Sequence, residues 1–161
     1  MTLVSVPTAA NGVDVRSSRP SLSPEGRPLR VLVVEDDDDS RDMVAWYSHR
    51  NRFVENLGRR SRYSIHFMFA NDNVVDRNRF YDNAVGVYFM YTEGGVARNN
   101  IISHATGATG MGIGFKEASG TIIENNEIIY CGIGIGSDLS PFQPDSTIEV
   151  RGNRFAYNGI G

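Results

Sequence analysis

The chain is poor in several residue types, and each shortage excludes a class of protein. A single cysteine, Cys131, excludes an intramolecular disulfide. Lysine occurs once, at Lys116, and 16 basic residues face 19 acidic ones without a basic stripe, so nucleic acid is not an expected partner. No apolar run approaches the roughly 20 residues of a membrane span. The N-terminus also lacks the apolar segment of a secretory signal, so we expect neither a membrane span nor an export signal in this sequence.

Charge and periodicity divide the sequence into two parts. Residues 1–43 hold five Arg against eight Asp or Glu, whereas residues 44–161 hold 11 basic and 11 acidic residues. The first 29 residues mix Ser, Pro, Arg and Gly without helical or strand periodicity, which is typical of disorder. We therefore expect a disordered or fused tail at 1–43 and a separate repeat domain at 44–161.

The segment LRVLVVEDDDDSRDM (29–43) reads as one strand followed by an acidic cluster. It resembles the opening strand and acidic pocket of a response-regulator receiver domain, which would imply phosphorylation near Asp36–Asp39. A receiver also needs a doubly wound sheet of about five strands and a lysine further along the chain. The residues that follow 43 already show a different repeat, so we interpret 29–43 as a strand-like segment of the tail.

The repeat domain is recognisable from asparagines spaced 22 residues apart, at Asn56, Asn78 and Asn100. A fixed period of this size predicts a solenoid, in which stacked repeats share one core. In SIHFMF (64–69) the apolar side chains alternate, so Ile65, Phe67 and Phe69 are expected to point inward. Long helical patterns are absent. The prediction is an all-β, right-handed parallel β-helix of about five coils, truncated at its C-terminus and able to self-associate through open ends.

Three columns of side chains follow from the register. An asparagine ladder is expected at a bend, and its members are Asn56, Asn78, Asn100, Asn126 and Asn153. Inward columns are expected at Phe53, Val75, Ala97, Ile123 and Val150, and at Gly58, Phe80, Ile102, Ile128 and Phe155. An outward column of alternating sign is expected to form exposed ion pairs, at Asp76, Arg98, Glu124 and Arg151.

Alternation also predicts a surface of large side chains on the outside of one sheet. Its members are Trp46, His66, Met68, Tyr88, Met90 and Lys116. Large apolar side chains that point to water are typical of an interaction surface. The alternative interpretation is that they pack under the N-terminal tail or a neighbouring segment. Thioether and imidazole groups suit copper, so His66, Met68 and Met90 are the candidate metal ligands.

Other motifs are few. The sequence has no CxxC, HExxH, GxSxG or phosphate-binding loop, and no catalytic residue can be assigned. Two insertions rich in turn formers, SHATGATG (103–110) and SDLSPFQPD (137–145), are expected to protrude from one edge of the solenoid, where binding sites usually lie.

Three segments resemble the β-helix of the NosD family, and they are VAWYSHRNRFVEN, YSIHFMFANDNVVDRNRFYDN and VGVYFMYTEGGVARNN. The pieces HFMF and YFMY, each followed by an Asn-rich bend, are the more specific part. The resemblance covers residues 44–161. It implies a non-catalytic periplasmic factor that works with an ABC transporter and a copper chaperone in assembling the copper centre of nitrous oxide reductase.

The shared pattern N-x-[IF]-x-x-N also occurs in β-helix proteins that bind or modify polysaccharides. In that alternative, Trp46 and Tyr88 would stack on sugar rings and acidic residues would supply any chemistry. Copper is the cofactor implied by the first reading, and a sugar is the ligand implied by the second.

Overall fold

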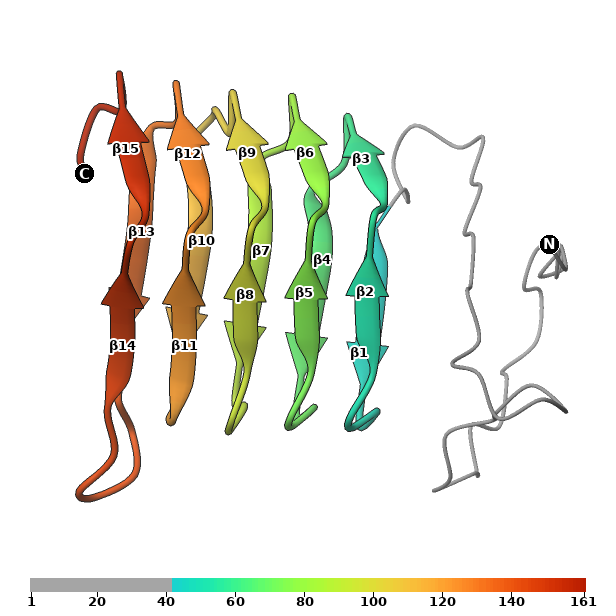
Figure 1. Ribbon diagram of the computed structural model, residues 1–161, viewed down its shortest axis with the longest axis vertical. Coiled ribbons are helices and arrows are strands. Elements are labelled where there is room, and N and C mark those ends of the chain that lie inside the picture. The colour runs from blue at the N-terminus through green and yellow to red at the C-terminus, as the bar shows by residue number, and fades with distance from the viewer. Residues whose placement is uncertain (1–41) are drawn as a thin grey trace, which may run out of the picture.

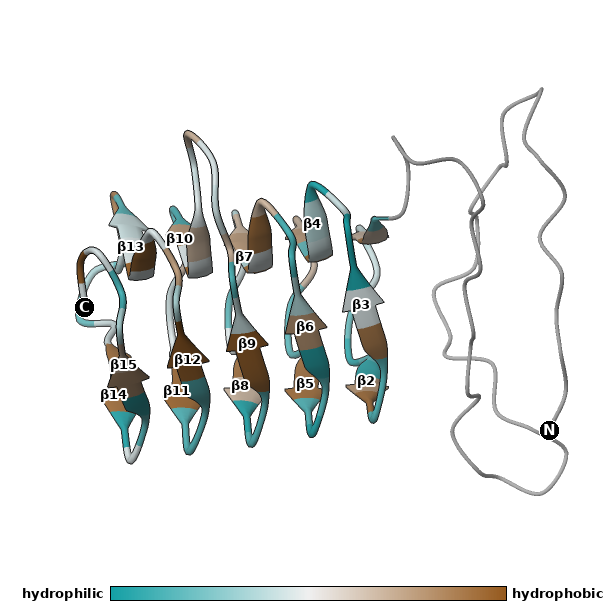
Figure 2. Ribbon diagram, turned by 90° about the horizontal axis from the view of Figure 1, so that it is seen from above, coloured by the Kyte–Doolittle hydropathy of each residue, from teal (hydrophilic) through white to brown (hydrophobic). Residues whose placement is uncertain are grey.

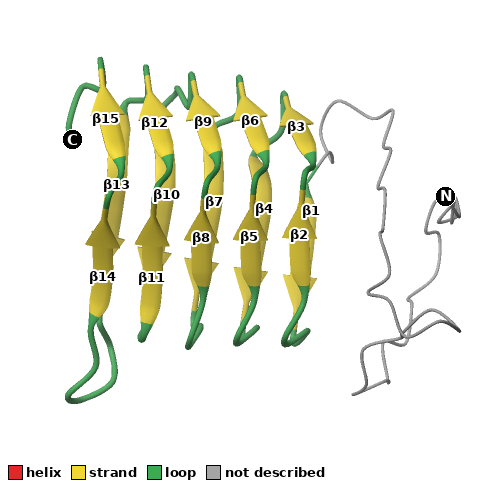
Figure 3. Ribbon diagram, viewed as in Figure 1, coloured by secondary structure: helices red, strands yellow, loops and turns green. Residues whose placement is uncertain are grey.

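The computed structural model describes residues 42–161; the tail prediction and almost all of the receiver-like segment 29–43 lie outside the described residues. Within the described part, all regular structure consists of fifteen short strands, without a helix (Figure 3). The predicted all-β solenoid is therefore confirmed. No helix among these residues has the length and hydropathy needed to cross a membrane.

The strands form three sheets of five strands, and every pairing is parallel (Figure 1). Sheet 1 consists of β1 (Met43–Trp46), β4 (Tyr63–Met68), β7 (Val85–Met90), β10 (Met111–Lys116) and β13 (Ile133–Asp138). Sheet 2 consists of β2 (Arg52–Val54), β5 (Val74–Asp76), β8 (Val96–Arg98), β11 (Thr121–Glu124) and β14 (Ile148–Arg151). Sheet 3 consists of β3 (Leu57–Arg59), β6 (Arg79–Tyr81), β9 (Ile101–Ser103), β12 (Glu127–Ile129) and β15 (Arg154–Ala156). One strand from each sheet makes a rung, and sheet 1 faces sheets 2 and 3 across the interior (Figure 2).

The strand register follows the spacing of the repeat. His66 pairs with Tyr88, and Tyr88 pairs with Gly114 in the next strand. The insertion at 103–110 falls between β9 and β10, where the chain passes from sheet 3 to sheet 1, and the insertion at 137–145 falls between β13 and β14, where it passes from sheet 1 to sheet 2. The two insertions therefore lie at different corners and not at one edge, which corrects the prediction. Because both insertions lie where the chain passes between sheets, the ladders on either side continue in register.

The interior is a set of apolar columns that run along the solenoid. The rings of Phe67, Phe89 and Phe115 stack in adjacent rungs, with centroids 5.1 and 5.9 Å apart. The columns predicted to point inward do so in the central rungs, where Val75, Ala97, Ile123, Phe80, Ile102 and Ile128 are at most 1% exposed. Each buried Val, Ile or Phe side chain contributes roughly 1.5–3 kcal/mol to stability. In the fifth rung the corresponding Val150 is 48% exposed, since only one of its neighbouring positions along the stack is filled.

Residues with left-handed backbone turn the chain at the end of each sheet-1 strand. Their φ angles lie between +47° and +54°, and the residues are Tyr47, Phe69, Tyr91, Glu117 and Leu139. This corrects one expectation, because Phe69 does not continue the inward alternation of Ile65 and Phe67. The strand β4 ends at Met68, and the left-handed turn carries Phe69 to the corner, where it is 37% exposed.

The asparagines of the ladder lie at the bend between sheets 2 and 3. Each of Asn56, Asn78, Asn100 and Asn126 donates from both its backbone N–H and its side-chain Nδ2 to the Oδ1 of the next member, at 2.8 to 2.9 Å. The side chains thereby satisfy backbone groups that the bend leaves without a partner in the sheets.

The outward charged column departs from expectation at Asp76, which is 1% exposed rather than solvated. Its carboxylate accepts hydrogen bonds from Arg77, Arg98 and Asn99 at 3.0 to 3.3 Å. Burial alone would raise the pKa of Asp76, but the hydrogen bond from Asn99 and the charges of Arg98 and Arg77 outweigh it, so its pKa is lowered. Glu124 and Arg151 do form the expected surface ion pair, at 2.9 Å.

Candidate functional site

The structure brings the six residues of the predicted surface together on the outer face of sheet 1. Trp46, Met68, Met90 and Lys116 form one column of paired residues, and His66 and Tyr88 lie in the neighbouring column with Gly114. Residues two apart on a strand share a face, and paired residues lie about 4.8 Å apart across a sheet. The two columns therefore make one continuous patch, which we call the methionine face.

The methionine face is only partly open to solvent. Trp46 is 59% exposed, because it lies on the first strand of the sheet. His66, Met68, Tyr88, Met90 and Lys116 are all half-buried. Lys116 ends the methionine column, and its Nζ lies 3.9 Å from a carboxylate oxygen of Asp138. The thioethers are therefore shielded by their neighbours while still reachable from outside.

His66 is held between two tyrosine rings. Its imidazole stacks on Tyr63 with centroids 4.6 Å apart and meets Tyr88 edge-on at 5.7 Å. Its Nε2 atom is buried and has no hydrogen-bond partner. Burial lowers the pKa of His66, the charge of Asp42 opposes that effect, and Arg62 adds to it. The imidazole is therefore neutral at neutral pH, which is the form that binds a metal ion.

Two residues of this face did not stand out in the sequence, namely Tyr63 and Met111. Strict alternation would put Tyr63 on the inner side with Ile65. Ser64, however, has no paired residue in the neighbouring strand β7, so the alternation is interrupted at the start of β4. Tyr63 instead stacks on the outward His66. The sulfur of Met111 lies over Gly136. The alternating glycines of β10 and β13 were the sequence signal for such large outward side chains. Gly114 leaves the space that the Tyr88 ring occupies, and Gly136 leaves the space that Met111 occupies.

The donor atoms of the methionine face fit a soft metal ion. The paired thioethers of Met68 and Met90, with the imidazole of His66 and its free buried nitrogen, suit Cu(I), and the face offers no carboxylate cluster for a hard cation. Consistent with this, residues 42–161 contain no group of three or more His, Cys, Asp or Glu arranged to hold a metal ion. Met111 is a third thioether of this face, but it lies at the start of β10, outside the column of Met68 and Met90. His66, Met68 and Met90 are the residues of this face that could hold copper.

The remaining candidate metal ligands are engaged elsewhere. Cys131 is 3% exposed within the core, its Sγ donates to the backbone oxygen of Ile129 at 3.4 Å, and burial raises the pKa of its thiol. His49 accepts a hydrogen bond from the backbone of Asn71, and His104 stacks on Tyr130. Cys131 is thus a small core residue, as its apolar neighbours in sequence indicate.

A comparison with protein families gives one match. The model of the family described as "Periplasmic copper-binding protein (NosD)" matches residues 8–161, which is nearly the whole chain. Neither a curated protein nor a solved structure matches.

Proposed function

The chain belongs to the NosD family of periplasmic copper-binding proteins, and from this premise we propose that it binds Cu(I) on the methionine face. The ligands in this proposal are the imidazole of His66 and the thioethers of Met68 and Met90. The observation that carries it is the buried, neutral and unpartnered Nε2 of His66, beside two outward methionines of paired strands.

The chemistry of these donors favours the reduced ion. Thioether sulfur is a soft ligand, and a neutral imidazole adds a borderline one, so the set prefers Cu(I) to the hard divalent cations. The rings of Tyr63 and Tyr88 restrict the orientation of His66, which is the role that neighbouring groups usually play around metal ligands.

The wider role follows from the family and remains a proposal. We infer that the chain works in the periplasm as a non-catalytic scaffold in the maturation of the copper centre of nitrous oxide reductase. An ABC transporter and a copper chaperone are the partners that this role implies. The exposed Trp46 at the edge of the methionine face is a suitable contact for such a partner.

The experiment is a Cu(I) titration of the full chain under reducing, anaerobic conditions in competition with a chromogenic chelator. The double variant Met68→Leu/Met90→Leu removes both sulfurs while keeping apolar volume, and His66→Gln removes the imidazole. Each is expected to weaken Cu(I) binding by roughly tenfold or more. Met43→Leu is the matched control, because Met43 packs against the core. Equal affinity of the double variant and the wild type would contradict the proposal.

A further inference from the structure

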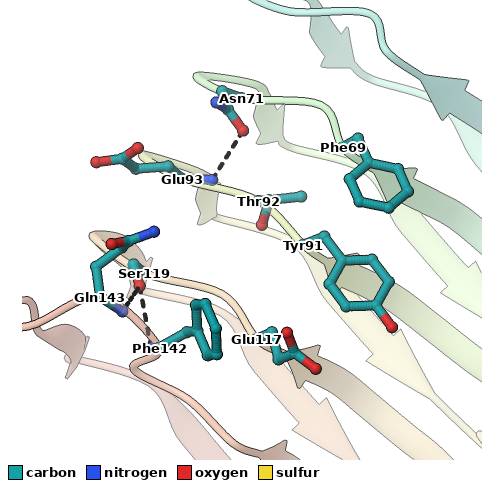
Figure 4. A pocket seen from close by; sticks show the side chains of 9 residues that line it. All are labelled: Phe69, Asn71, Tyr91, Thr92, Glu93, Glu117, Ser119, Phe142 and Gln143. Atoms are coloured by element: carbon teal, nitrogen blue, oxygen red, sulfur yellow. Dashed lines mark hydrogen bonds between the residues drawn. The ribbon is translucent and has the colours of Figure 1, made fainter.

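A groove of about 330 Å³ lies at the corner between sheets 1 and 2 (Figure 4). Phe69, Tyr91 and Glu117 of its lining directly follow Met68, Met90 and Lys116 in the sequence, so the groove borders the methionine face. Residues that follow β7 and β10 line one side, including Tyr91, Thr92 and Glu117, and Phe142 from the insertion at 137–145 lines the other. Its volume is at the lower end of the range for small-ligand sites.

The groove exists because a column of stacked rings stops. Tyr47, Phe69 and Tyr91 occupy the same corner position in successive rungs, with ring centroids 5.1 and 4.8 Å apart. The next rung has Glu117 at this position. Tyr91 therefore stacks on a ring, that of Phe69, on one face only, and its other face borders the groove.

The insertion supplies the second wall and is anchored to the rung before it. The backbone N–H groups of Phe142 and Gln143 donate to Ser119 Oγ at 3.1 and 2.8 Å. The N–H of Ala118 donates to Ser140 Oγ at 2.9 Å. These bonds hold the ring of Phe142, 55% exposed, on the opposite side of Glu117 from Tyr91 (Figure 4).

The charged groups of the groove are all acidic. Glu93 and Glu117 contribute carboxylates, and no basic side chain lines the groove. Within residues 42–161 neither carboxylate has an ion-pair or hydrogen-bond partner. Aromatic faces and carboxylates both attract a cation, and together they repel an anion.

One buried hydroxyl in the wall also lacks a partner. Thr92 is 4% exposed, its Oγ1 has no hydrogen bond, and the hydroxyl points into the groove in Figure 4. The other short polar side chains there are already used, since Asn71 accepts from the backbone of Glu93 and Ser119 accepts from the insertion. Thr92 Oγ1 is thus an unused acceptor in the wall, and an N–H donor bound beside it would give it a hydrogen bond that the free protein does not make.

We propose that this groove is a second ligand site, which binds an organic cation carrying N–H donors, an alkylammonium or guanidinium group. Tyr91 and Phe142 contact the cation through their rings, Glu117 neutralises its charge, and Thr92 Oγ1 accepts one of its N–H groups. None of the residues named for the cation is a proposed copper ligand.

The test is a titration of the full chain followed by the backbone amide signals in NMR spectra. The probes are n-butylammonium, tetramethylammonium, methyl glucoside and sodium chloride at matched ionic strength. Saturable shifts confined to the groove are expected with n-butylammonium, and weaker ones with tetramethylammonium, which has no N–H group. Comparing the affinities for n-butylammonium and for Nα-acetyl-lysine amide distinguishes two sources of the cation. Tighter binding of n-butylammonium indicates a free amine, and tighter binding of Nα-acetyl-lysine amide indicates a lysine side chain of a protein partner; either result supports the proposal.

Three variants make the test specific. Glu117→Gln is expected to weaken n-butylammonium binding about tenfold, whereas Glu127→Gln, which removes a carboxylate from sheet 3, should not. Phe142→Ala should weaken the binding of both n-butylammonium and tetramethylammonium, because it removes one of the two rings that contact the cation. Phe142 is exposed, so the substitution does not disturb the core. Thr92→Val should weaken the binding of n-butylammonium, which donates an N–H group to Thr92 Oγ1, but not the binding of tetramethylammonium, which has no N–H group. Equal loss in Glu117→Gln and Glu127→Gln, shifts no larger than those from sodium chloride, or binding of methyl glucoside alone would overturn the proposal.

Discussion

Asn78 donates two hydrogen bonds to a single atom of Asn100, one from its backbone N–H and one from its side-chain Nδ2, both at 2.9 Å to Oδ1. The same Nδ2 also donates to the backbone oxygen of Phe53 in the rung before, at 2.9 Å. One side chain thus connects three rungs, and the bend between sheets 2 and 3 is held along the whole stack.

Replacing Asn100 by Ala should destabilise the solenoid strongly. Asn100 is buried, and its loss removes the acceptor of the Asn78 N–H, one of the acceptors of Asn78 Nδ2, and the side-chain donor to the backbone oxygen of Val75. The expected loss is about 2–4 kcal/mol, measured by chemical denaturation.

Asn56→Ala is the matched control for Asn100→Ala. Asn56 lies in the first described rung and donates to Asn78 Oδ1, which keeps its second donor, the backbone N–H at position 56. Asn56→Ala should therefore lower the free energy of unfolding by less than half as much as Asn100→Ala. Similar destabilisation by both substitutions would contradict a ladder that is held by its buried interior members.

Acid should destabilise the protein through Asp76. Its folded pKa lies below the ordinary value of 3.8, so the charged form is favoured by folding. The resulting stability is present above about pH 4 and is lost as the pH falls through the folded pKa. Asp76→Asn should lower stability at neutral pH and flatten the acid limb of a plot of unfolding free energy against pH.

The control for this pH dependence is Glu149→Gln. Glu149 is a surface carboxylate paired with Arg151, and its side chain is 51% exposed. The substitution removes one carboxylate without touching the arginines around Asp76, so the acid limb should keep its slope. If Asp76→Asn kept the wild-type slope as well, the buried ion network would not be the cause.

Gly114→Ala should displace Tyr88 from the methionine face. An added Cβ would collide with the Tyr88 ring, which lies over the glycine. Because Tyr88 also contacts His66, the ring protons of the histidine should change their NMR chemical shifts. Gly136→Ala is the control, since its Cβ meets the flexible Met111 side chain instead. Unchanged His66 signals in Gly114→Ala would show that Tyr88 does not set the environment of the histidine.

The sequence predicted the features that repeat with a fixed spacing. The asparagine ladder and the order of the columns depend on one residue per rung. Two intervals of 22 residues establish the register, and the asparagines that follow after 26 and 27 residues continue it past the insertions. The interior columns follow because the large apolar side chains in the second half of each central sheet-1 strand alternate with outward ones, as Phe67 does with His66 and Met68.

The features it did not predict lie at corners, where alternation stops. Phe69 turns outward because the backbone is left-handed there, and Tyr63 joins the outer face because the ladder skips Ser64. Asp76 is buried because Arg77 and Asn99, which lie at the bends directly after β5 and β8, hydrogen-bond to its carboxylate. A pattern of inward and outward positions contains no information about such side chains.

The most direct test of copper binding at the methionine face is the X-ray absorption spectrum of the full chain loaded with one equivalent of Cu(I). Sulfur neighbours together with one imidazole are the expected result, and Met68→Leu/Met90→Leu should remove the sulfur contribution. Only nitrogen or oxygen neighbours, or the same spectrum in the double variant, would contradict a copper site built on His66, Met68 and Met90.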